Sequence, residues 1–398
     1  MDIQSFTKQL QNANTTQILE LILEGAVSLN ASDIHLEPQE KDLRVRFRID
    51  GVLQEVARLP RETHKNLLSR VKFMAKMGLN INNTPQDGRF SQVVNGRHFD
   101  FRCATLPLVN GENIVIRLLE QEAQFYTLTQ LGFRKDMAEK LAGVIKRPQG
   151  MILNVGPTGS GKTTTLYSIL NELNTPGVKI ITLEDPIEYK IEGIAQSQID
   201  PTRGFGFAEA LKGSLRSDPD IIMVGEIRDT ETANIALQAA LTGHLVLSTF
   251  HANNAPSTLI RLVEIGVHPY LLSGSINVIL AQRLARKICT QCREQYKIDK
   301  MMLNYLRVKM PQYKIPGSLW RGRGCPVCSG TGYKGRIAIG EILVPTPDIE
   351  DLIIRHVSLT QVTELARRQE GLTLEQDGLL KAISGITTLE EVFRVTRE

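Results

Sequence analysis

The first apolar pattern along the chain has the period of a helix. Apolar side chains recur every three or four residues over 14–28, and either Asn14 or Thr15 would cap the first turn. Residues 43–49 then alternate strictly, which places four apolar side chains on one face of a strand and three arginines on the other. The Asp-Gly pair at 50–51 is a hairpin signal. These patterns predict a first helix followed by a β-hairpin.

Alternating segments continue to about residue 120. A helical stretch around 62–77 is followed by short alternating runs separated by Asn-Gly pairs, and these runs predict strands near 89–94, 97–104 and 113–119. The mixture predicts a small α+β domain over 1–120. Residues after Glu120 are polar and lack an apolar period, so we expect a linker over 121–128.

From about residue 129 the pattern changes to almost continuous apolar runs that alternate with helical segments. The runs are 151–155, 179–183, 221–224 and 245–249. Strands that are apolar on both faces are typical of a parallel sheet covered by helices on both sides. We therefore expect an α/β domain over 129–398, with a Cys-, Gly- and Pro-rich subdomain over 286–336 and a helical C-terminal region over 346–398.

Composition narrows the class of protein only slightly. The chain has 398 residues and is 42% hydrophobic, which suits two or three domains with sizeable cores. Its 47 basic and 43 acidic residues give a net charge of +4, and this small charge neither requires nor excludes binding to nucleic acid. No run approaches the roughly 20 apolar residues needed to span a bilayer, and the N-terminus lacks a signal-peptide pattern. We therefore expect a cytoplasmic protein.

A phosphate-binding loop is predicted directly after the strand at 151–155. The sequence from Gly156 to Thr163 fits the pattern G-x-x-x-x-G-K-[ST] and precedes a predicted helix. Its glycines let backbone N–H groups curl round phosphates, Lys162 reaches the β- and γ-phosphates, and Thr163 offers a hydroxyl to Mg²⁺. A Gly-rich turn without a ligand is the alternative. The residues expected to bind nucleotide are Gly156, Pro157, Thr158, Gly159, Ser160, Gly161, Lys162 and Thr163.

Acidic residues follow two of the predicted strands. Glu184 ends the run at 179–183, and Glu226 follows the run at 221–224 with Gly225 in place of the usual Walker-B acid. In an open parallel sheet the carboxyl ends of strands line the ligand crevice, so both carboxylates should face the nucleotide. One should hold Mg²⁺ through water while the other orients or deprotonates the attacking water. Alternatively, these acids only end strands and cap helices.

Two histidines flank the apolar run at 245–249. His251 follows the run at the level of the acids and is a candidate sensor of the γ-phosphate, whereas His244 precedes it and is the weaker candidate. A lone histidine is more often a structural residue, and this alternative stays open for both.

Four cysteines form the pattern C-x₂-C-x₃₂-C-x₂-C. Four thiolates on two knuckles suit tetrahedral Zn²⁺, and such a closed site folds a subdomain rather than catalyses. Two redox dithiols or plain buried cysteines are the alternatives. The expected zinc ligands are Cys289, Cys292, Cys325 and Cys328, while Cys103 is expected to be a core residue of a strand.

The arginines of 43–49 have two interpretations. A solvated strand face is the default. Alternatively, a domain that precedes an ATPase core presents a rigid cationic row whose members reach the γ-phosphate as arginine fingers. Arg46 and Arg48 are the candidates we carry forward, and alternation places Arg44 on the same face.

Taken together, these motifs closely resemble those of the type II secretion and type IV pilus assembly ATPases. The resemblance covers essentially the whole chain and implies a PAS-like N-terminal domain that moves against a RecA-like ATPase domain in a homohexamer. It rests on Ala31–Pro38, Arg46–Gly51, Gly156–Thr163, Ile181–Glu188, Asp218–Asp229 and the four cysteines.

The resemblance also implies roles for individual residues. Lys162 and Thr163 become the Walker-A pair, Glu184 the catalytic glutamate of the Asp box, and Glu226 the Walker-B glutamate associated with Mg²⁺. His251 becomes the His-box residue, and the N-terminal arginines become finger candidates. ATP, Mg²⁺ and Zn²⁺ are the implied ligands.

A mechanism follows from the same resemblance. ATP hydrolysis in a cytoplasmic hexamer would drive domain motions that an inner-membrane platform protein turns into extrusion of pilin-like subunits. This implies peripheral membrane association through partners and no direct contact with nucleic acid. Pilus-retraction members lack the tetracysteine insert, so the cysteines favour assembly or secretion. Many members carry further N-terminal domains, which leaves a natural short form and a truncated chain both open. A nucleic-acid translocase and a nucleotide-gated scaffold are the rival functions.

Overall fold

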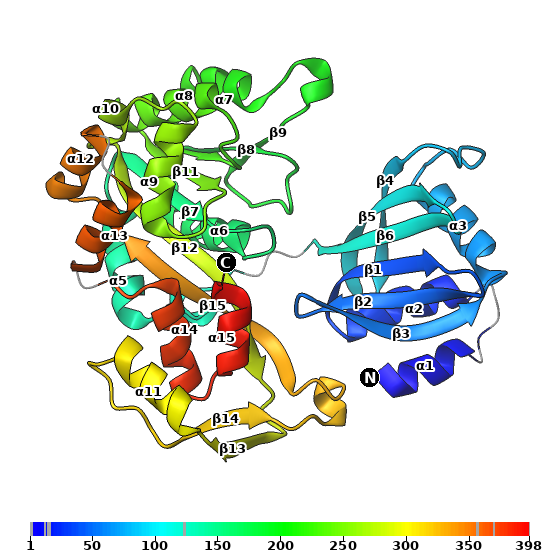
Figure 1. Cartoon of the computed structure of the whole chain (residues 1–398). Coiled ribbons are helices and arrows are strands. Elements are labelled where there is room, and N and C mark those ends of the chain that lie inside the picture. Colours follow the sequence, from blue (N-terminus) through cyan, green and yellow to red (C-terminus); the bar gives the residue numbers. More distant parts are fainter. Residues whose placement is uncertain are drawn as a thin grey trace. The chain divides into compact units, whose positions relative to one another are not determined.

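The computed structural model describes residues 3–11, 13, 17–121, 125–355, 358–368 and 371–397, and the chain divides into two compact units (Figure 1). The first unit comprises Met1–Ala123, Cys289–Arg293 and Gly322–Gly335. The second comprises Gln124–Ile288, Glu294–Arg321 and Arg336–Glu398. Residues 122–124 of the predicted linker lie outside the described residues.

The N-terminal unit is built on a six-stranded antiparallel sheet with the strand order β3-β2-β1-β6-β5-β4. Its strands are β1 (Ala31–Pro38), β2 (Asp42–Ile49), β3 (Val52–Pro60), β4 (Gln86–Val94), β5 (Arg97–Leu108) and β6 (Gly111–Glu120). The apolar face predicted for 43–49 is buried, because Val45 and Phe47 are both inaccessible to solvent. The prediction of an α+β domain therefore holds for this part of the chain.

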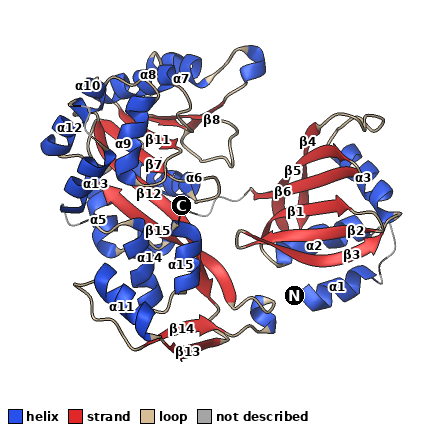
Figure 2. Cartoon of the chain, in the orientation of Figure 1, coloured by secondary structure: helices blue, strands red, loops and turns tan. Residues whose placement is uncertain are grey.

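Three helices supply the rest of that core, and they are α1 (Ile3–Gln11), α2 (Ile18–Ser28) and α3 (Thr63–Met74) (Figure 2). The helix predicted within 14–28 is present as α2, but it is not the first helix, because α1 precedes it; Asn14 and Thr15 lie outside the described residues. Strand β1 was also missed. Phe6 of α1 packs against Phe47 with ring centroids 5.4 Å apart, so the extra helix extends the same core.

The second unit contains a seven-stranded sheet with the order β15-β12-β7-β11-β10-β8-β9, and the six strands from β12 to β9 run parallel. Its strands are β7 (Gly150–Val155), β8 (Ile180–Glu184), β9 (Ala195–Gln198), β10 (Ile221–Val224), β11 (Leu245–Phe250), β12 (Ile276–Ile288) and β15 (Tyr333–Leu343). Every residue of β7, β8, β10 and β11 is buried, as their continuous apolar sequences predict. Sequence reasoning found four of the seven strands and missed β9, β12 and β15.

Helices cover both faces of this sheet. Alternate residues of β7 enter different cores, because Met151 and Leu153 pack with α7, α8, α9 and α13, whereas Ile152 packs with α5 and α6. The helices are α4 (Leu128–Leu131), α5 (Lys135–Val144), α6 (Lys162–Leu173), α7 (Phe207–Leu215), α8 (Thr230–Leu241), α9 (Ala255–Glu264), α10 (Pro269–Leu272), α12 (Pro347–Ile354), α13 (Leu359–Arg368), α14 (Leu374–Ile383) and α15 (Leu389–Thr396). The predicted α/β class is therefore correct.

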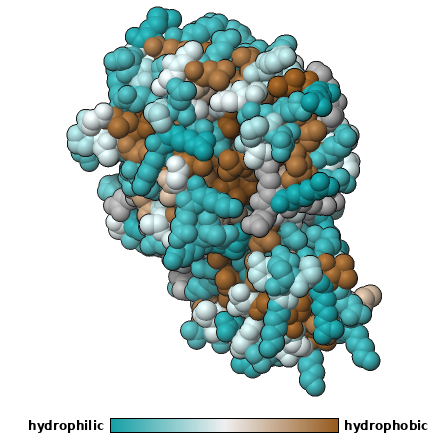
Figure 3. All heavy atoms as spheres, turned by 90° about the vertical axis from the view of Figure 1, so that its left-hand side faces the viewer, coloured by the Kyte–Doolittle hydropathy of each residue, from teal (hydrophilic) through white to brown (hydrophobic). Residues whose placement is uncertain are grey.

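The segment between β12 and β15 contains a separate two-stranded sheet and one helix. Strands β13 (Arg293–Lys297) and β14 (Ser318–Gly322) pair with each other, and α11 (Lys300–Lys309) lies between them in sequence. Leu306 of α11 packs with Leu379 of α14 and Val392 of α15, so this segment shares a core with the C-terminal helices. On the face of the chain shown in Figure 3, apolar residues occur as patches among hydrophilic ones.

Candidate nucleotide-binding site

The phosphate-binding loop connects β7 to α6. Gly156, Gly159 and Gly161 have φ values of +156°, +77° and +86°, which side chains other than glycine rarely adopt. Gly161 directly precedes α6, so the free backbone N–H groups of the helix start at Lys162. A Cβ atom on Gly159 would meet nothing within 4 Å, so the loop backbone borders open space. A helix N-terminus with such a loop suits a phosphate.

Lys162 is the cation of this loop. Its Nζ donates to the backbone oxygens of Gly156 at 2.8 Å and Pro157 at 3.0 Å. Burial and, to a smaller extent, the nearby Arg283 guanidinium lower the pKa of Lys162 to about 8, although the Glu226 carboxylate opposes the shift. A phosphate dianion would stabilise the charged ammonium in this position.

Polar side chains of β7 and β12 form hydrogen bonds with the end of the loop and the first turn of α6. The buried Gln282 Oε1 accepts from Asn154 Nδ2 at 3.0 Å and from Thr165 Oγ1 at 2.9 Å. The same Asn154 nitrogen donates to the backbone oxygen of Lys162 at 3.3 Å. Among the described residues, no group pairs with the buried Ser160 Oγ. A buried hydroxyl without a partner fits a loop made for a polar ligand.

Glu226 follows β10 and lies beside other charged groups. Its Oε2 is 3.7 Å from His251 Nε2, and its Oε1 accepts from Arg228 Nη2. Arg228 Nη1 is also 3.8 Å from Asp185 Oδ2. The side chain of Glu226 is 19% exposed and that of His251 is 51% exposed, so both can meet a ligand from solvent. The structure thus brings Glu226 and His251 together near Lys162.

Gly225 occupies a crowded position where the usual acid would be a tight fit. A Cβ atom built on it would lie 3.1 Å from the backbone oxygen of Leu183, and its own N–H donates to that oxygen at 2.8 Å. The close approach of β10 to β8 therefore gives a physical reason for glycine here. The acid directly after Gly225 is Glu226.

Glu184 ends β8 and is only 3% exposed. Its Oε1 accepts from Thr182 Oγ1 at 2.6 Å and from Gln196 Nε2 at 3.1 Å, and its Oε2 accepts from the hydroxyl of Tyr167. Burial and the neighbouring Glu184 carboxylate raise the pKa of Tyr167 far above its ordinary value, so this hydroxyl stays a donor. Sequence reasoning missed Tyr167, because no pattern marks which residue of α6 meets the acid of the next strand.

The two histidine candidates lie at opposite ends of β11. His244 precedes the strand, and its backbone nitrogen and Nδ1 lie 3.2 Å from the backbone oxygen of Ala239. His251 follows the strand at the end shared with Glu226. Strand direction therefore separates the candidates, and His244 is not part of the group around Glu226.

The four cysteines of the two knuckles are close together in space. Their Sγ atoms all lie within 4.8 Å of one another, and three of the sulfur–sulfur distances are 3.9, 3.8 and 3.7 Å. A tetrahedral zinc with bonds of about 2.3 Å requires sulfur–sulfur edges of about 3.8 Å. Backbone N–H groups of Cys325 and Gly332 also lie 3.2 Å from Cys328 Sγ, which favours a thiolate. The donor set therefore fits Zn²⁺. Cys103 lies apart in the buried face of β5, as predicted.

The arginine row of β2 is paired with acids of β1. Arg44 and Arg46 both bind Glu37, while Arg48 lies 3.5 Å from Asp33 and Arg117 of β6 lies 3.0 Å from it. A solvated face was the default interpretation, and the three arginine side chains of β2 are indeed partly exposed. The structure adds their ion pairs, which the sequence did not reveal because β1 was not recognised as the neighbouring strand.

A parallel sheet with a phosphate loop after β7 and an acid after β10 defines a P-loop nucleotide hydrolase. A model of the type II/IV secretion system protein family matches residues 8–394, and the chain belongs to this family.

Similar proteins agree with this assignment. The chain is 46% identical over 397 residues to the type II secretion system protein E of Pseudomonas aeruginosa, covering 100% of the chain and 78% of that protein. It is 44% identical over 392 residues to the type IV pilus assembly ATPase PilB of the same organism, covering 98% and 69%. The predicted family and its ATPase class are therefore confirmed.

Solved structures show the same fold. The pilus retraction motor PilT with bound ADP matches with a TM-score of 0.62 and 29% identity, covering 96% of this chain and 97% of that one. The ATPase DotB of Legionella pneumophila matches with a TM-score of 0.68 at 24% identity, covering 96% and 95%, and this likeness concerns the fold alone.

Within the described residues, no helix combines the length and the hydropathy needed to cross a membrane.

Proposed function

We propose that this chain binds ATP and Mg²⁺ in the site at the carboxyl ends of β7, β10 and β11, and that hydrolysis there powers pilus or pseudopilus assembly. The observation that carries the proposal is the proximity of Glu226 to His251 and to the charge of Lys162. The names of the relatives support the assembly or secretion role, and ADP bound to PilT supports an adenine nucleotide.

Each residue has a proposed part in the reaction. The loop Gly156–Thr163 holds the phosphates through its backbone N–H groups and Lys162, while Thr163 and Glu226 hold the metal ion. Bound Mg²⁺ neutralises charge on the transferred phosphoryl group. His251 contacts the γ-phosphate, and Glu184 orients or deprotonates the attacking water.

The proposed role of Glu184 requires a change in its contacts. Both carboxylate oxygens accept hydrogen bonds from side chains, and the group is almost fully buried. Because this carboxylate is buried, water reaches it only after a neighbouring side chain such as Tyr167 or Gln196 moves away. We propose that nucleotide binding to the loop shifts α6, which carries Tyr167, and so exposes Glu184.

Arg46 and Arg48 are proposed arginine fingers. Each now binds a carboxylate of β1, and a phosphate would replace Glu37 or Asp33 as the anionic partner. Alanine at either position should lower turnover at saturating ATP, whereas alanine at Arg58, an exposed arginine of β3 with its own acidic partners, should not.

The four cysteines Cys289, Cys292, Cys325 and Cys328 are proposed to hold one structural Zn²⁺. We also propose the domain limits given by the sequence, with an N-terminal domain over 1–120, a linker over 121–128 and an ATPase domain over 129–398. The zinc subdomain would cover 286–336.

We propose a homohexamer that works at the inner face of the cytoplasmic membrane through a platform protein, without direct contact with nucleic acid. The relatives' names support this machinery. Sedimentation with ATP analogues should give a hexamer, and the purified platform protein should raise the ATPase rate. Stimulation by DNA would instead support a translocase, and nucleotide-dependent partner binding that survives loss of turnover would support a scaffold.

The test of the nucleotide site uses Lys162→Ala and the control Lys179→Ala. Lys162 lies in the phosphate loop, whereas Lys179 is a lysine just before β8 whose ammonium binds a backbone oxygen. Titration with a fluorescent ATP analogue should show lost affinity for the first variant and retained affinity for the second. Unchanged affinity in Lys162→Ala would contradict the site.

A further inference from the structure

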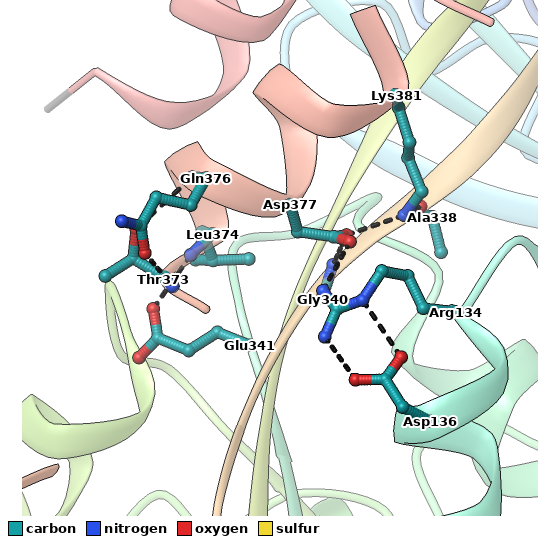
Figure 4. A network of polar contacts seen from close by, with 10 residues as sticks. All are labelled: Arg134, Asp136, Ala338, Gly340, Glu341, Thr373, Leu374, Gln376, Asp377 and Lys381. Atoms are coloured by element: carbon teal, nitrogen blue, oxygen red, sulfur yellow. Dashed lines mark hydrogen bonds and ion pairs between the residues drawn. The ribbon is translucent and has the colours of Figure 1, made fainter. Parts of the chain in front are cut away.

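Glu341 joins the first turns of two helices that are distant in sequence. It lies on β15 and is 8% exposed. Its Oε1 accepts from the backbone N–H of Ala255 at 3.0 Å, and its Oε2 accepts from that of Leu374 at 3.0 Å. Ala255 and Leu374 are the first residues of α9 and α14. Figure 4 shows the hydrogen bond between Glu341 and Leu374.

Glu341 adds to caps that both helices already have. The side chain of Asn254 accepts from the N–H of Ser257, the third residue of α9, at 2.9 Å, and that of Thr373 accepts from the N–H of Gln376, the third residue of α14, at 3.2 Å. Glu341 instead takes the first N–H of each helix. A carboxylate also interacts favourably with two helix N-termini at once, whereas a neutral amide has one acceptor oxygen.

Helix α14 is fixed to β15 by buried charges. The Asp377 carboxylate accepts from Gly340 N at 2.8 Å, from Lys381 Nζ at 2.6 Å and from Arg134 Nη1 at 2.9 Å (Figure 4). Lys381 also donates to the backbone oxygen of Ala338 at 2.6 Å. Because Asp377 and Lys381 are both buried, β15 and α14 behave as one rigid element to which Glu341 belongs.

Helix α9 leads back to the nucleotide site. The loop before it runs from His251 to Asn254, and His251 is the residue 3.7 Å from Glu226. Arg261 of α9 donates to the backbone oxygen of His251 at 2.8 Å, and Arg283 donates to that of Asn253 at 2.8 Å. The His251 loop is therefore attached directly to α9, both through the chain and through Arg261.

We propose that Glu341 is a positioning residue of the nucleotide site, which ties the His251 loop to the element formed by β15 and α14. The proposal rests on the proposed function in one respect, namely that His251 acts at the γ-phosphate. The phosphate loop has separate supports in Asn154 and Gln282, so loss of the tie should lower turnover while leaving ATP binding intact.

The test compares Glu341→Gln with Thr373→Ala in the full chain. Glutamine has the shape of glutamate, but its one acceptor oxygen can accept from only one of the two helix N–H groups. Thr373→Ala removes the side-chain cap of α14 and leaves the contact with α9 in place. For Glu341→Gln we expect kcat to fall about tenfold or more with KM for ATP within about twofold, because a small misplacement of a reacting group is costly. Hydrogen exchange within 255–257 should accelerate at the two amides present, those of Ala255 and Ser257, since Pro256 has no N–H. Thr373→Ala should change neither kcat nor this exchange.

Three results would overturn the proposal. These are unchanged kcat in Glu341→Gln, an equal loss of kcat in Thr373→Ala, and unchanged exchange at 255–257 in Glu341→Gln. If Glu341→Gln does not fold, Asn254→Ala loosens the same turn of α9 and should reproduce the fall in kcat at unchanged KM, and unchanged kcat there would also overturn the proposal.

A further variant separates this proposal from the proposed function. His251→Ala should lower kcat if His251 acts in the site. An unchanged kcat would refute that role of His251, and with it the effect of Glu341 on turnover. Exchange at 255–257 in Glu341→Gln reports on the tie between Glu341 and α9 in either case.

Discussion

The hydroxyl of Tyr167 on α6 donates to the buried carboxylate of Glu184 at the end of β8. The helix that begins at the phosphate loop is thereby linked to the acid that ends the next strand of the chain. Tyr167 is itself fully buried and its ring meets that of Tyr189 edge-on at 4.6 Å. This contact connects the helix that we propose nucleotide binding shifts, α6, with the proposed catalytic acid.

The first prediction concerns Tyr167→Phe. The change leaves Oε2 of Glu184 buried without its donor, which should cost about 1–3 kcal/mol of the free energy of unfolding. Because the carboxylate also loses its orientation, kcat should fall while KM for ATP stays nearly constant. Urea unfolding and steady-state kinetics measure the two effects. The control Tyr189→Phe keeps the ring contact and should have the smaller effect on kcat, and an equal effect would contradict the role given to Tyr167.

The second prediction concerns proton uptake by Lys162. Its pKa of about 8 in the free site means that it loses charge as the pH rises through 8. Bound phosphates favour the charged form and raise this pKa, so ATP binding near pH 8.5 should take up a fraction of a proton. Near pH 6.5, where Lys162 is already charged, its contribution to proton uptake should vanish. Calorimetry in buffers of different ionisation enthalpy measures the uptake. If proton uptake on ATP binding were the same at pH 6.5 and pH 8.5, the depressed pKa of Lys162 would be contradicted.

The depressed pKa has a consequence for stability as well. Unfolded Lys162 binds its proton up to its ordinary pKa of 10.5, whereas the folded group releases it near 8. The unfolded state therefore holds more protons between pH 8 and 10.5, and this residue alone makes the folded state more favourable as the pH rises through that window.

The third prediction concerns zinc. Metal analysis should find about one zinc per chain, and Cys328→Ser should lose it because four thiolates close the site. Cys103→Ala removes the remaining cysteine, which is buried in β5, and should keep the metal. A chain that folds without metal and with disulfides between the knuckles would contradict the zinc assignment.

The fourth prediction concerns the two acids that share Arg134. Asp377→Ala leaves Lys381 and Arg134 without their buried carboxylate and should destabilise the chain by about 3–5 kcal/mol. Asp136 binds the same arginine, but its side chain is 59% exposed, so Asp136→Ala should cost no more than about 1 kcal/mol. Denaturant unfolding of both variants checks the difference. Equal losses would show that burial does not decide the strength of these pairs.

Local patterns predicted much of the chemistry, because the phosphate loop and the cysteine knuckles are short motifs whose spacing carries their geometry. The acids at Glu184 and Glu226 were placed by the rule that parallel strands end at one edge. That rule did not predict their different surroundings. The burial of Glu184 depends on Tyr167 and Gln196, which reach it from other elements.

The missed features share one physical cause. Strand β1, the acids that pair with Arg46 and Arg48, and the link from Glu341 to α9 all depend on contacts between residues distant in sequence. The period of a segment reports which face is apolar but does not identify the neighbouring element. Helix α1 was missed because only Phe6 and Leu10 are fully buried along it, too few to define a period.

The most direct test of the account is the ATP turnover of Glu226→Gln, measured beside Glu231→Gln. Glu231 is an acid of α8 with 61% side-chain exposure that pairs with Lys212. Glu226→Gln should still bind ATP but lose most turnover, about 10²-fold or more, because the carboxylate acts in the reacting state. Glu231→Gln should turn over ATP at the rate of the unaltered chain. An unchanged rate in purified Glu226→Gln, free of contaminating ATPases, would contradict the account.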